Sequence, residues 1–175
     1  MAKKTNDDGD RLVSNLRKIA LFQKFDAAFF SLFAGKLEVA GYRAGEKIIN
    51  EGDPGREVYF LLSGTVRVVK KTLSGDEYTT ALLKDEYGVF FGELGLLTED
   101  TRSASIISET DSVLAKMSSV NFHSFVAENP GYGAQLTMGL ATSICHKLKK
   151  ANKDMVILYE ALMGEIRSAN LGTDL

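Results

Sequence analysis

The most chemically informative stretch of the chain is a glycine-rich loop that is followed by an arginine. In Gly92-Glu93-Leu94-Gly95 two glycines stand three residues apart at the start of a short helical turn. This arrangement lets backbone N–H groups approach an anion. Arg102 follows nine residues after Glu93, and its planar guanidinium matches the oxygens of a phosphate bidentately. The stretch therefore predicts a phosphate-binding loop.

Glu93 lies in the same turn and would repel a phosphate placed beside it. We therefore expect its carboxylate to accept a hydrogen bond from a neutral hydroxyl, such as the 2′-OH of a ribose. A cyclic ribose phosphate would satisfy both groups at once. The simpler alternative is that Arg102 forms a surface ion pair with Glu99 or Asp100 and that Glu93 only lies near a helix N-terminus.

Short runs of β-branched and aromatic residues, separated by turn residues, surround this loop and are typical of strands. No helix of ordinary length stands between them, which favours an antiparallel barrel or jelly roll over βαβ units. The predicted fold is mainly β with flanking α-helices: a jelly-roll β-roll (double-stranded β-helix) with N-terminal helices and a long C-terminal helix. The predicted strands are 37–42, 47–49, 58–62, 65–71, 78–84, 103–108 and 113–117.

Helical spacing is found on both sides of the strands. Residues 1–10 are polar and predict a disordered arm, with order from Arg11 onward. A helical stretch rich in phenylalanine follows and is expected to be core. The predicted domains are the arm 1–10, the β-roll domain with its N-terminal helices over 11–130, the long helix over 131–170 and a tail over 171–175.

The long C-terminal helix carries apolar residues at alternating spacings of three and four, which is the pattern of a coiled-coil seam. A helix of this length reaches roughly 55 Å, longer than one small domain can cover. It either folds back at Gly139 or Gly164, or packs on a second copy, so a homodimer is expected. The seam residues are Ala141, Ile144, Leu148, Ala151, Met155, Leu158 and Leu162.

The composition excludes several classes of protein. Of 175 residues 45% are hydrophobic and 25% are charged, which is too apolar for a disordered chain. The formal net charge of -2 provides no general basic field for nucleic acid. Glycines and Pro130 interrupt the uncharged stretch 129–145, so no membrane span is predicted. The N-terminus lacks the apolar core of a signal peptide, and we expect a cytoplasmic protein.

Catalysis has no candidate residues. The single cysteine, Cys145, is predicted to be buried in the final helix. Two histidines, His123 and His146, are too few for a structural zinc site. No Ser/His/Asp or Cys/His set and no nucleophile elbow occurs. We therefore predict no enzyme activity, no metal and no cofactor.

The loop and the strands together resemble a known family. Residues 91–97 (Phe-Gly-Glu-Leu-Gly-Leu-Leu) and 101–106 (Thr-Arg-Ser-Ala-Ser-Ile) resemble the phosphate-binding cassette of cyclic-nucleotide-binding domains. The family includes the bacterial catabolite activator protein, protein kinase regulatory subunits and cyclic-nucleotide-gated channels. Upstream, 45–46, 51–53 and 58–66 resemble the family's glycine-turned strands at the family's distances. The resemblance covers about residues 12–150.

The resemblance implies a role for each residue of the cassette. Glu93 would accept a hydrogen bond from the ribose 2′-OH, and Arg102 would pair with the cyclic phosphate. Backbone N–H groups of Gly92, Gly95 and Ser103 would complete the phosphate cradle. The implied ligand-binding residues are Phe91, Gly92, Glu93, Leu94, Gly95, Arg102, Ser103 and Ala104.

The resemblance leaves the base of the nucleotide open. Ser103 stands where several channels and cyclic-GMP-dependent kinases have Thr, so its hydroxyl would reach the phosphate or the amine of a syn guanine. Cyclic AMP and cyclic GMP therefore both remain open as ligands. Activator-like members contact the base from the following helix, and the match implies base contacts by Lys150, Ala151 and Asn152.

The chain also departs from the family's pattern. Thr101 replaces a common Pro and Gly95 a common Ala, and both changes loosen the loop. The activators continue into a helix-turn-helix, whereas this sequence ends at Leu175, so no direct DNA binding is expected. The predicted function is a cyclic-nucleotide sensor that relays binding through its C-terminal helix to an unidentified protein partner. The alternatives are an interaction module with an empty or degenerate pocket, and a phosphodiesterase-like enzyme, which would lack metal ligands and a base.

Overall fold

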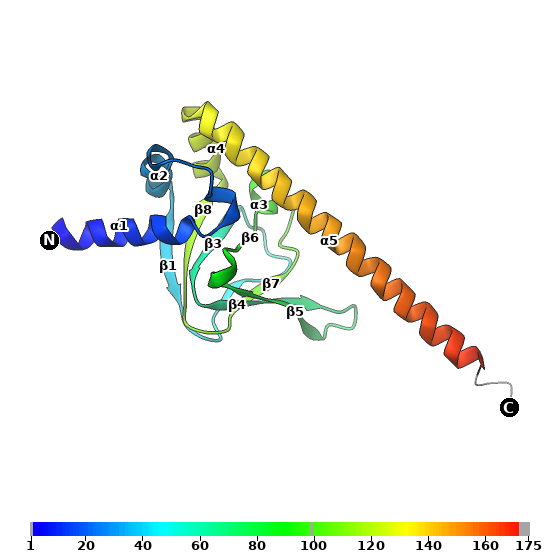
Figure 1. Ribbon diagram of the computed structural model, residues 1–175. Helices are drawn as coiled ribbons and strands as arrows, with labels where there is room; N and C mark the ends of the chain where they lie inside the picture. The colour runs from blue at the N-terminus through cyan, green and yellow to red at the C-terminus, as the bar shows by residue number, and fades with distance from the viewer. Residues whose placement is uncertain (1, 99, 172–175) are drawn as a thin grey trace. The chain divides into compact units, whose positions relative to one another are not determined.

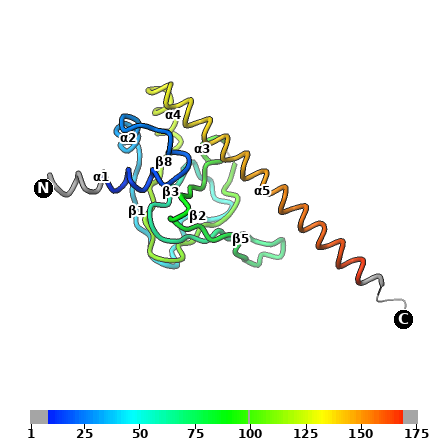
Figure 2. The backbone as a smooth tube through the Cα atoms, viewed as in Figure 1, coloured from blue at the N-terminus to red at the C-terminus, as the bar shows by residue number. Residues whose placement is uncertain are grey.

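The computed structural model describes residues 2–98 and 100–171, with side chains over 9–98 and 100–168 (Figure 1, Figure 2). The chain divides into two units, Met1–Ala134 and Gln135–Leu175. Every strand that the structure describes lies in the first unit. The second unit is the continuation of one long helix.

Two four-stranded antiparallel sheets form the body of the first unit. One sheet has the strand order β1-β8-β3-β6, and the other has the order β2-β7-β4-β5. This arrangement confirms the predicted β-roll with flanking helices. The strands are β1 (Glu38–Tyr42), β2 (Lys47–Ile49), β3 (Glu57–Ser63), β4 (Thr65–Lys71), β5 (Glu77–Lys84), β6 (Phe90–Phe91), β7 (Ser105–Ser108) and β8 (Ser112–Ser118).

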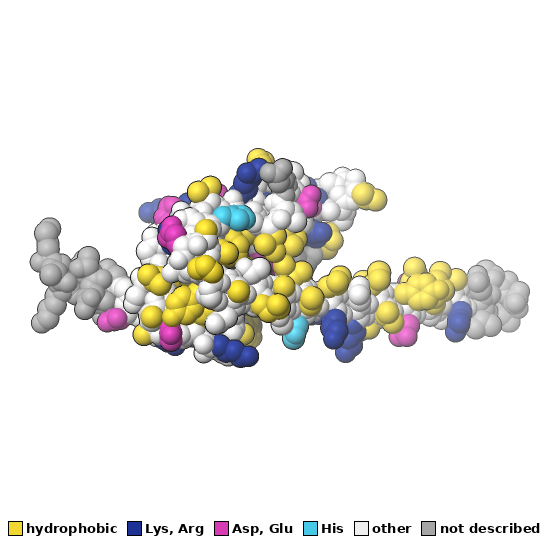
Figure 3. All heavy atoms as spheres, turned by 90° about the horizontal axis from the view of Figure 1, so that it is seen from above, with side chains coloured by type: hydrophobic (Ala, Val, Ile, Leu, Met, Phe, Trp, Pro, Cys, Tyr) yellow, Lys and Arg dark blue, Asp and Glu magenta, His cyan; other side chains and the backbone are white. Residues whose placement is uncertain are grey.

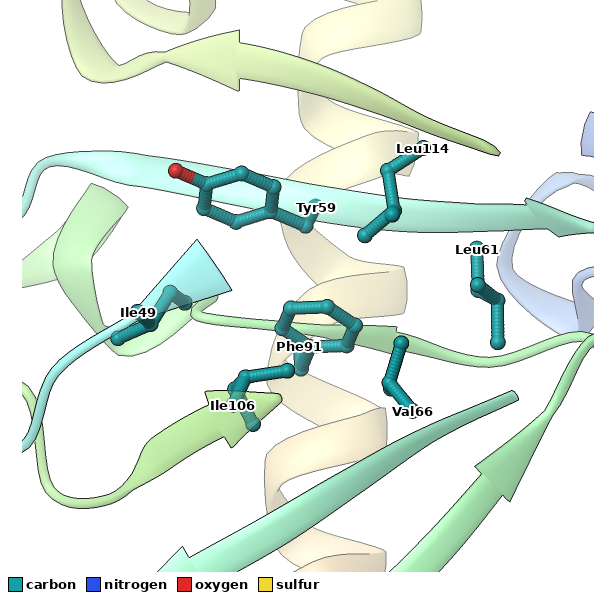
Figure 4. Packing of buried hydrophobic residues seen from close by; sticks show 7 residues of the cluster. All are labelled: Ile49, Tyr59, Leu61, Val66, Phe91, Ile106 and Leu114. Atoms are coloured by element: carbon teal, nitrogen blue, oxygen red, sulfur yellow. The ribbon is translucent and has the colours of Figure 1, made fainter. Parts of the chain in front are cut away.

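Side chains from both sheets meet in one apolar cluster (Figure 4). Successive residues of a strand point to opposite faces of its sheet. Tyr59 and Leu61 of β3 therefore face this cluster, while Phe60 between them packs on the helices, 5.2 Å from Phe22 between ring centroids. Strand β3 is buried on both faces. The cluster consists of Ile49, Tyr59, Leu61, Val66, Phe91, Ile106 and Leu114.

Helices cover the outer face of β3. Side-chain caps begin two of them: Asp26 accepts from the N–H of Phe29 at 2.9 Å, and Ser118 accepts from the N–H of Asn121 at 3.1 Å. Phenylalanines of these helices are buried, which confirms the predicted phenylalanine core. The helices of this unit are α1 (Ala2–Leu16), η1 (Ala20–Phe22), α2 (Ala27–Phe33), η2 (Ala34–Lys36), η3 (Asp85–Tyr87), α3 (Leu94–Leu97) and α4 (Ser119–Glu128).

Some boundaries differ from those predicted. Helix α1 begins at Ala2, whereas the sequence pattern predicts a disordered arm over 1–10. Adding a residue to an existing helix adds a hydrogen bond without a new nucleation step, so a helix formed near Arg11 extends easily toward the N-terminus. Strand β6 was not predicted, because two residues are too few to show a period.

The predicted strand over 103–108 begins only at Ser105. The preceding residues are held by a neighbouring loop instead of the sheet. The N–H of Arg102 donates to the carbonyl of Asp53 at 2.9 Å, and the carbonyl of Arg102 accepts from the N–H of Gly52 at 2.8 Å. Pro54 and Thr101 form an isolated β-bridge. This pairing fixes the backbone of Arg102 against the loop that precedes β3.

Helix α5 (Pro130–Leu171) is continuous over 42 residues, which corresponds to about 63 Å. Pro130 is its first residue, where a missing N–H removes no helical bond. The helix does not end at Gly139 or Gly164, so the first of the two alternatives, a fold-back at one of these glycines, is wrong. Cys145 is exposed, against the prediction of a core residue, because a single helix has no interior of its own. Residues 172–175 of the predicted tail lie outside the described part of the chain.

Candidate functional site

The candidate site is the connection between β6 and β7. Phe91 ends β6, and Gly92 then turns the chain with a φ of +78°, a conformation that strains any residue with a Cβ. Glu93 precedes the four-residue helix α3, and Arg102 lies three residues before the first residue of β7. The two sheets therefore hold both ends of the predicted cassette.

Arg102 is buried although it carries a charge, since its exposed fraction is only 8%. Its Nη1 donates to the carbonyl of Glu57 at 2.9 Å and to the carbonyl of Gly92 at 3.3 Å. Its Nη2 lies 2.8 Å from Oε2 of Glu57. The guanidinium carbon lies 5.8 Å from the centroid of the Tyr59 ring. These contacts fix the position of the guanidinium.

Glycines make room for this arginine. A Cβ at Gly55 would collide with Nε and Cζ of Arg102. A Cβ at Gly92 would lie 2.8 Å from Nη1 of Arg102 and 2.8 Å from the carbonyl oxygen of Glu57. Glycine at both positions therefore leaves room for Arg102 in its present place, and Gly92 is also required by the backbone turn.

Glu93 is the second buried charge of the cassette, with an exposed fraction of 6%. Buried carboxylates are stable only where they find hydrogen-bond donors or a cation. Backbone hydrogen bonds close the turn around Glu93. The N–H of Gly95 donates to the backbone carbonyl of Gly92 at 3.1 Å, and the N–H of Leu96 donates to the backbone carbonyl of Glu93 at 3.1 Å. Two ionisable groups of opposite sign are thus buried in one loop.

Two aromatic rings pack beside the cassette. Tyr59 of β3 and Phe91 of β6 are stacked, with centroids 5.6 Å apart and planes 11° from parallel. Burial raises the pKa of the Tyr59 phenol, and the nearby carboxylate of Glu57 raises it further. The phenol therefore remains neutral at physiological pH. These rings connect the cassette to the core between the sheets (Figure 4).

The structure brings the predicted cassette residues into one loop. Leu94 and Ser103 are exposed, Ala104 is half-buried and Gly95 is buried. The three residues predicted to contact a base, Lys150, Ala151 and Asn152, are exposed on α5. They belong to the second unit, and their contact with a ligand stays a prediction.

The simpler alternative for Arg102, a surface ion pair, is wrong. The arginine pairs with Glu57 and is buried, whereas the alternative was a surface pair with Glu99 or Asp100. Glu99 itself lies outside the described residues. Sequence reasoning missed Glu57, which lies 45 residues before Arg102. No local pattern marks it, because the contact depends on the loop pairing described above.

The described part of the chain has neither a metal site nor a membrane-spanning helix. Among the side chains that the structure describes, over 9–98 and 100–168, no group of three His, Cys, Asp or Glu is arranged to hold a metal ion. No helix over 2–98 or 100–171 is long and apolar enough to cross a membrane.

Comparison with known proteins gives this loop its context. The sequence model of the cyclic nucleotide-binding domain family matches residues 40–129, which is slightly more than half of the chain. The chain belongs to this family. The matched range contains the whole cassette, from Phe91 to Ala104, and all strands of both sheets except the first two residues of β1.

The chain matches part of several longer curated relatives. The chain is 32% identical over 94 residues to the cAMP-dependent protein kinase regulatory subunit of Dictyostelium discoideum, covering 53% of this chain and 29% of that protein. It is 32% identical over 117 residues to the cyclic AMP receptor protein of Thermus thermophilus, covering 67% and 51%. The human hyperpolarization-activated cyclic nucleotide-gated channel 2 matches at 29% over 158 residues, covering 88% and 16%. The chain thus spans about half or less of these relatives.

Solved structures share the fold. The catabolite activator protein of Thermus thermophilus superposes with a TM-score of 0.70 at 29% identity, covering 79% of this chain and 62% of that chain. A cyclic nucleotide-binding domain from Methylobacillus flagellatus superposes with a TM-score of 0.72 at 21% identity, covering 82% and 80%. The second likeness supports the fold alone.

Proposed function

We propose that this chain binds a cyclic nucleotide, cyclic AMP or cyclic GMP, and acts as a regulatory sensor without catalysing a reaction. The observation that carries the proposal is the buried Arg102, held in a glycine-lined loop of the β-roll. A buried guanidinium is a strong receptor for phosphate, because little water competes with its hydrogen bonds. The family match over 40–129 supports the same ligand class.

Arg102 and Glu93 divide the ligand between them in this proposal. Arg102 pairs with the cyclic phosphate, and backbone N–H groups of Gly92, Gly95 and Ser103 complete the cradle. In the present structure the N–H of Gly95 donates to Gly92, so ligand binding includes a rearrangement of this turn. Glu93 accepts a hydrogen bond from the ribose 2′-OH, which is a neutral donor and does not bring two negative charges together.

Ser103 belongs to the cassette and its side chain is exposed, so it is free of packing contacts that would keep it from a ligand. A hydroxyl at this position can donate to a phosphate oxygen or accept from the exocyclic amine of a syn guanine. Cyclic GMP therefore stands beside cyclic AMP as a proposed ligand. Lys150, Ala151 and Asn152 of α5 are proposed to contact the base.

Helix α5 is the proposed output element. Many of its apolar side chains are exposed, and Figure 3 shows apolar side chains along the length of the helix. Met155, Leu158 and Leu162 are 62%, 69% and 53% exposed. An exposed a/d seam of this kind favours pairing with a second helix. We therefore propose a homodimer through α5, in which ligand shifts the population of helix positions by its differential affinity for them.

Thermal unfolding of the full chain, with and without each cyclic nucleotide, tests the proposal. Ligand at 100 times its Kd stabilises the folded state by about 2.7 kcal/mol, which raises the melting temperature by several degrees. Arg67→Ala is a suitable control, because it removes an arginine that pairs with Glu109 outside the cassette, and the ligand-induced shift should persist. The absence of a shift with millimolar cyclic AMP and cyclic GMP contradicts the proposal and favours an interaction module with a degenerate pocket.

A further inference from the structure

Glu57 introduces a negative charge beside the proposed phosphate site. Its Oε2 lies 2.8 Å from Nη2 of Arg102, and its backbone carbonyl accepts from Nη1 at 2.9 Å. The carboxylate side chain is 39% exposed, whereas that of Arg102 is 8% exposed. The accessible part of this ion pair is therefore its acidic partner.

The guanidinium has little freedom to move away from Glu57. Gly55 and Gly92 lie so close to it that a Cβ at either position would overlap with its nitrogens. The backbone of Arg102 is fixed by its bonds to Asp53 and Gly52. A phosphate must therefore meet the arginine close to its present position, with the Glu57 carboxylate as a neighbour.

We infer that Glu57 determines specificity by favouring a singly charged phosphodiester over a doubly charged phosphomonoester. Electrostatic repulsion between Glu57 and the ligand grows in proportion to the ligand's charge. A cyclic nucleotide carries one negative charge on its phosphate. A 5′-nucleotide carries nearly two at pH 7.4, because the second pKa of a phosphomonoester is about 6. Glu57 thus opposes the 5′-nucleotide about twice as strongly, on a logarithmic scale of affinity.

The other charges of the cassette do not remove this effect. Arg102 and Glu57 form an ion pair that has no net charge. The ligand's phosphate shares Arg102 with Glu57, and Arg102 is the one basic residue in the sequence of the cassette, 91–104, so each further negative charge on the ligand adds repulsion from Glu57 without a further cassette cation. The inference rests on the proposed function, since it concerns the same phosphate site.

Removal of the charge at constant shape provides the test. Glu57→Gln keeps an oxygen that accepts from Nη2 but removes the negative charge, and Glu57→Ala removes both. Glu109→Gln is the matched control, because Glu109 also pairs with an arginine, Arg67, but follows the far end of β7. Binding of cyclic AMP is measured by calorimetry, and binding of 5′-AMP by competition with a fluorescent cyclic AMP analogue, all at pH 7.4 and one salt concentration.

The expected result is an unequal gain. Glu57→Gln should tighten cyclic AMP about three- to tenfold and 5′-AMP about ten- to a hundredfold, in line with one and two units of repulsion. Glu57→Ala should narrow the ratio of the two affinities in the same direction, and Glu109→Gln should leave it unchanged. If the affinities for both ligands change equally, or if both ligands bind more weakly, the inference about Glu57 is wrong. In that case binding of cyclic AMP to the parent chain still supports the proposed function. If neither the parent chain nor Glu57→Gln binds cyclic AMP, both proposals are wrong.

Discussion

The phenol of Tyr132 donates to both carboxylate oxygens of Asp26, at 2.8 and 3.0 Å, across 106 residues of the chain. Asp26 also caps α2 through the N–H of Phe29. The first turn of α5 is therefore tied to the N-terminal helices by one side-chain pair. Hydrogen bonds from Phe29 and Tyr132 lower the pKa of Asp26, and the same bond to Asp26 raises the pKa of Tyr132.

Tyr132→Phe should lower the melting temperature at neutral pH and leave the fold unchanged. The pKa of Asp26 is lower in the folded state than in the unfolded state. The ionised carboxylate therefore stabilises the folded state fully above the unfolded pKa of about 3.9, and this stabilisation is lost as the pH falls through the folded-state pKa. The difference between the parent and Tyr132→Phe should therefore shrink in acid. The pKa of Tyr132 is raised, so the stabilisation by its neutral phenol is present below its unfolded pKa of about 10 and is lost as the pH rises through the folded-state pKa. Melting curves from pH 2 to 11 check this, and a constant difference contradicts it. Tyr78→Phe on β5 is the control.

Gly55→Ala should impair binding more than stability. The new Cβ would overlap with the guanidinium of Arg102 and force this side chain, rather than the backbone, out of its present position. Displacement moves the guanidinium away from the proposed phosphate position, so binding of a cyclic nucleotide should weaken at least tenfold, which equals about 1.4 kcal/mol. Gly35→Ala is the control, since nothing lies within 4 Å of its Cβ position. Calorimetry and melting curves measure the two effects, and parent-like binding by Gly55→Ala contradicts the geometry.

Leu158→Asp should disrupt the proposed dimer. Leu158 belongs to the apolar seam of α5 and is 69% exposed in the single chain. A carboxylate buried without a partner in a dimer interface costs about 3 kcal/mol or more, so the dissociation constant should rise more than a hundredfold. Sedimentation or light scattering at several concentrations checks this result.

Ile157→Asp provides the matched control for the seam. Ile157 is the adjacent residue, 53% exposed, and lies about 100° further around the helix. The same change of side chain there should leave the dimer intact. Equal effects of the two variants, or a parent chain that is monomeric at tens of micromolar, contradict the coiled-coil proposal.

The fold was largely predictable because its signals are local. Short apolar runs and turn residues indicate most strands, and β2 and β4 have the predicted bounds. Strand β6 was missed because Phe90 and Phe91 are assigned only through pairing with β3. The length of α5 could be read from its period, but the exposure of Cys145 depends on what the helix packs against.

The site was predictable in part for the same reason. Glu93 and Arg102 lie in one contiguous cassette, so their residue types and spacing place them in one loop, and their roles in binding stay a prediction. Glu57 was not found, because its carboxylate meets Arg102 only after the loop at Gly52 pairs with the segment that precedes β7. Long-range contacts of this kind leave no period or spacing in the sequence.

The roles of Arg102 and Glu93 can be separated because each faces a different part of the proposed ligand. Arg102→Ala removes a charge-assisted contact in a buried loop and should weaken binding by about 2 to 4 kcal/mol. Arg102→Lys should recover only part of this loss, because it restores the charge without the planar fork. Glu93→Gln weakens a single bond to a neutral hydroxyl, and its effect should be about 1 to 2 kcal/mol.

Titration calorimetry of the parent, Arg102→Ala and Glu93→Gln with cyclic AMP and with 2′-deoxy cyclic AMP tests this division of roles most directly. The deoxy ligand lacks the hydroxyl assigned to Glu93 and keeps the phosphate assigned to Arg102. We predict that the effect of Glu93→Gln disappears with the deoxy ligand, while the loss caused by Arg102→Ala persists. Parent-like binding by Arg102→Ala, or an equal effect of Glu93→Gln on both ligands, would contradict the assignment of this loop as a cyclic-nucleotide site.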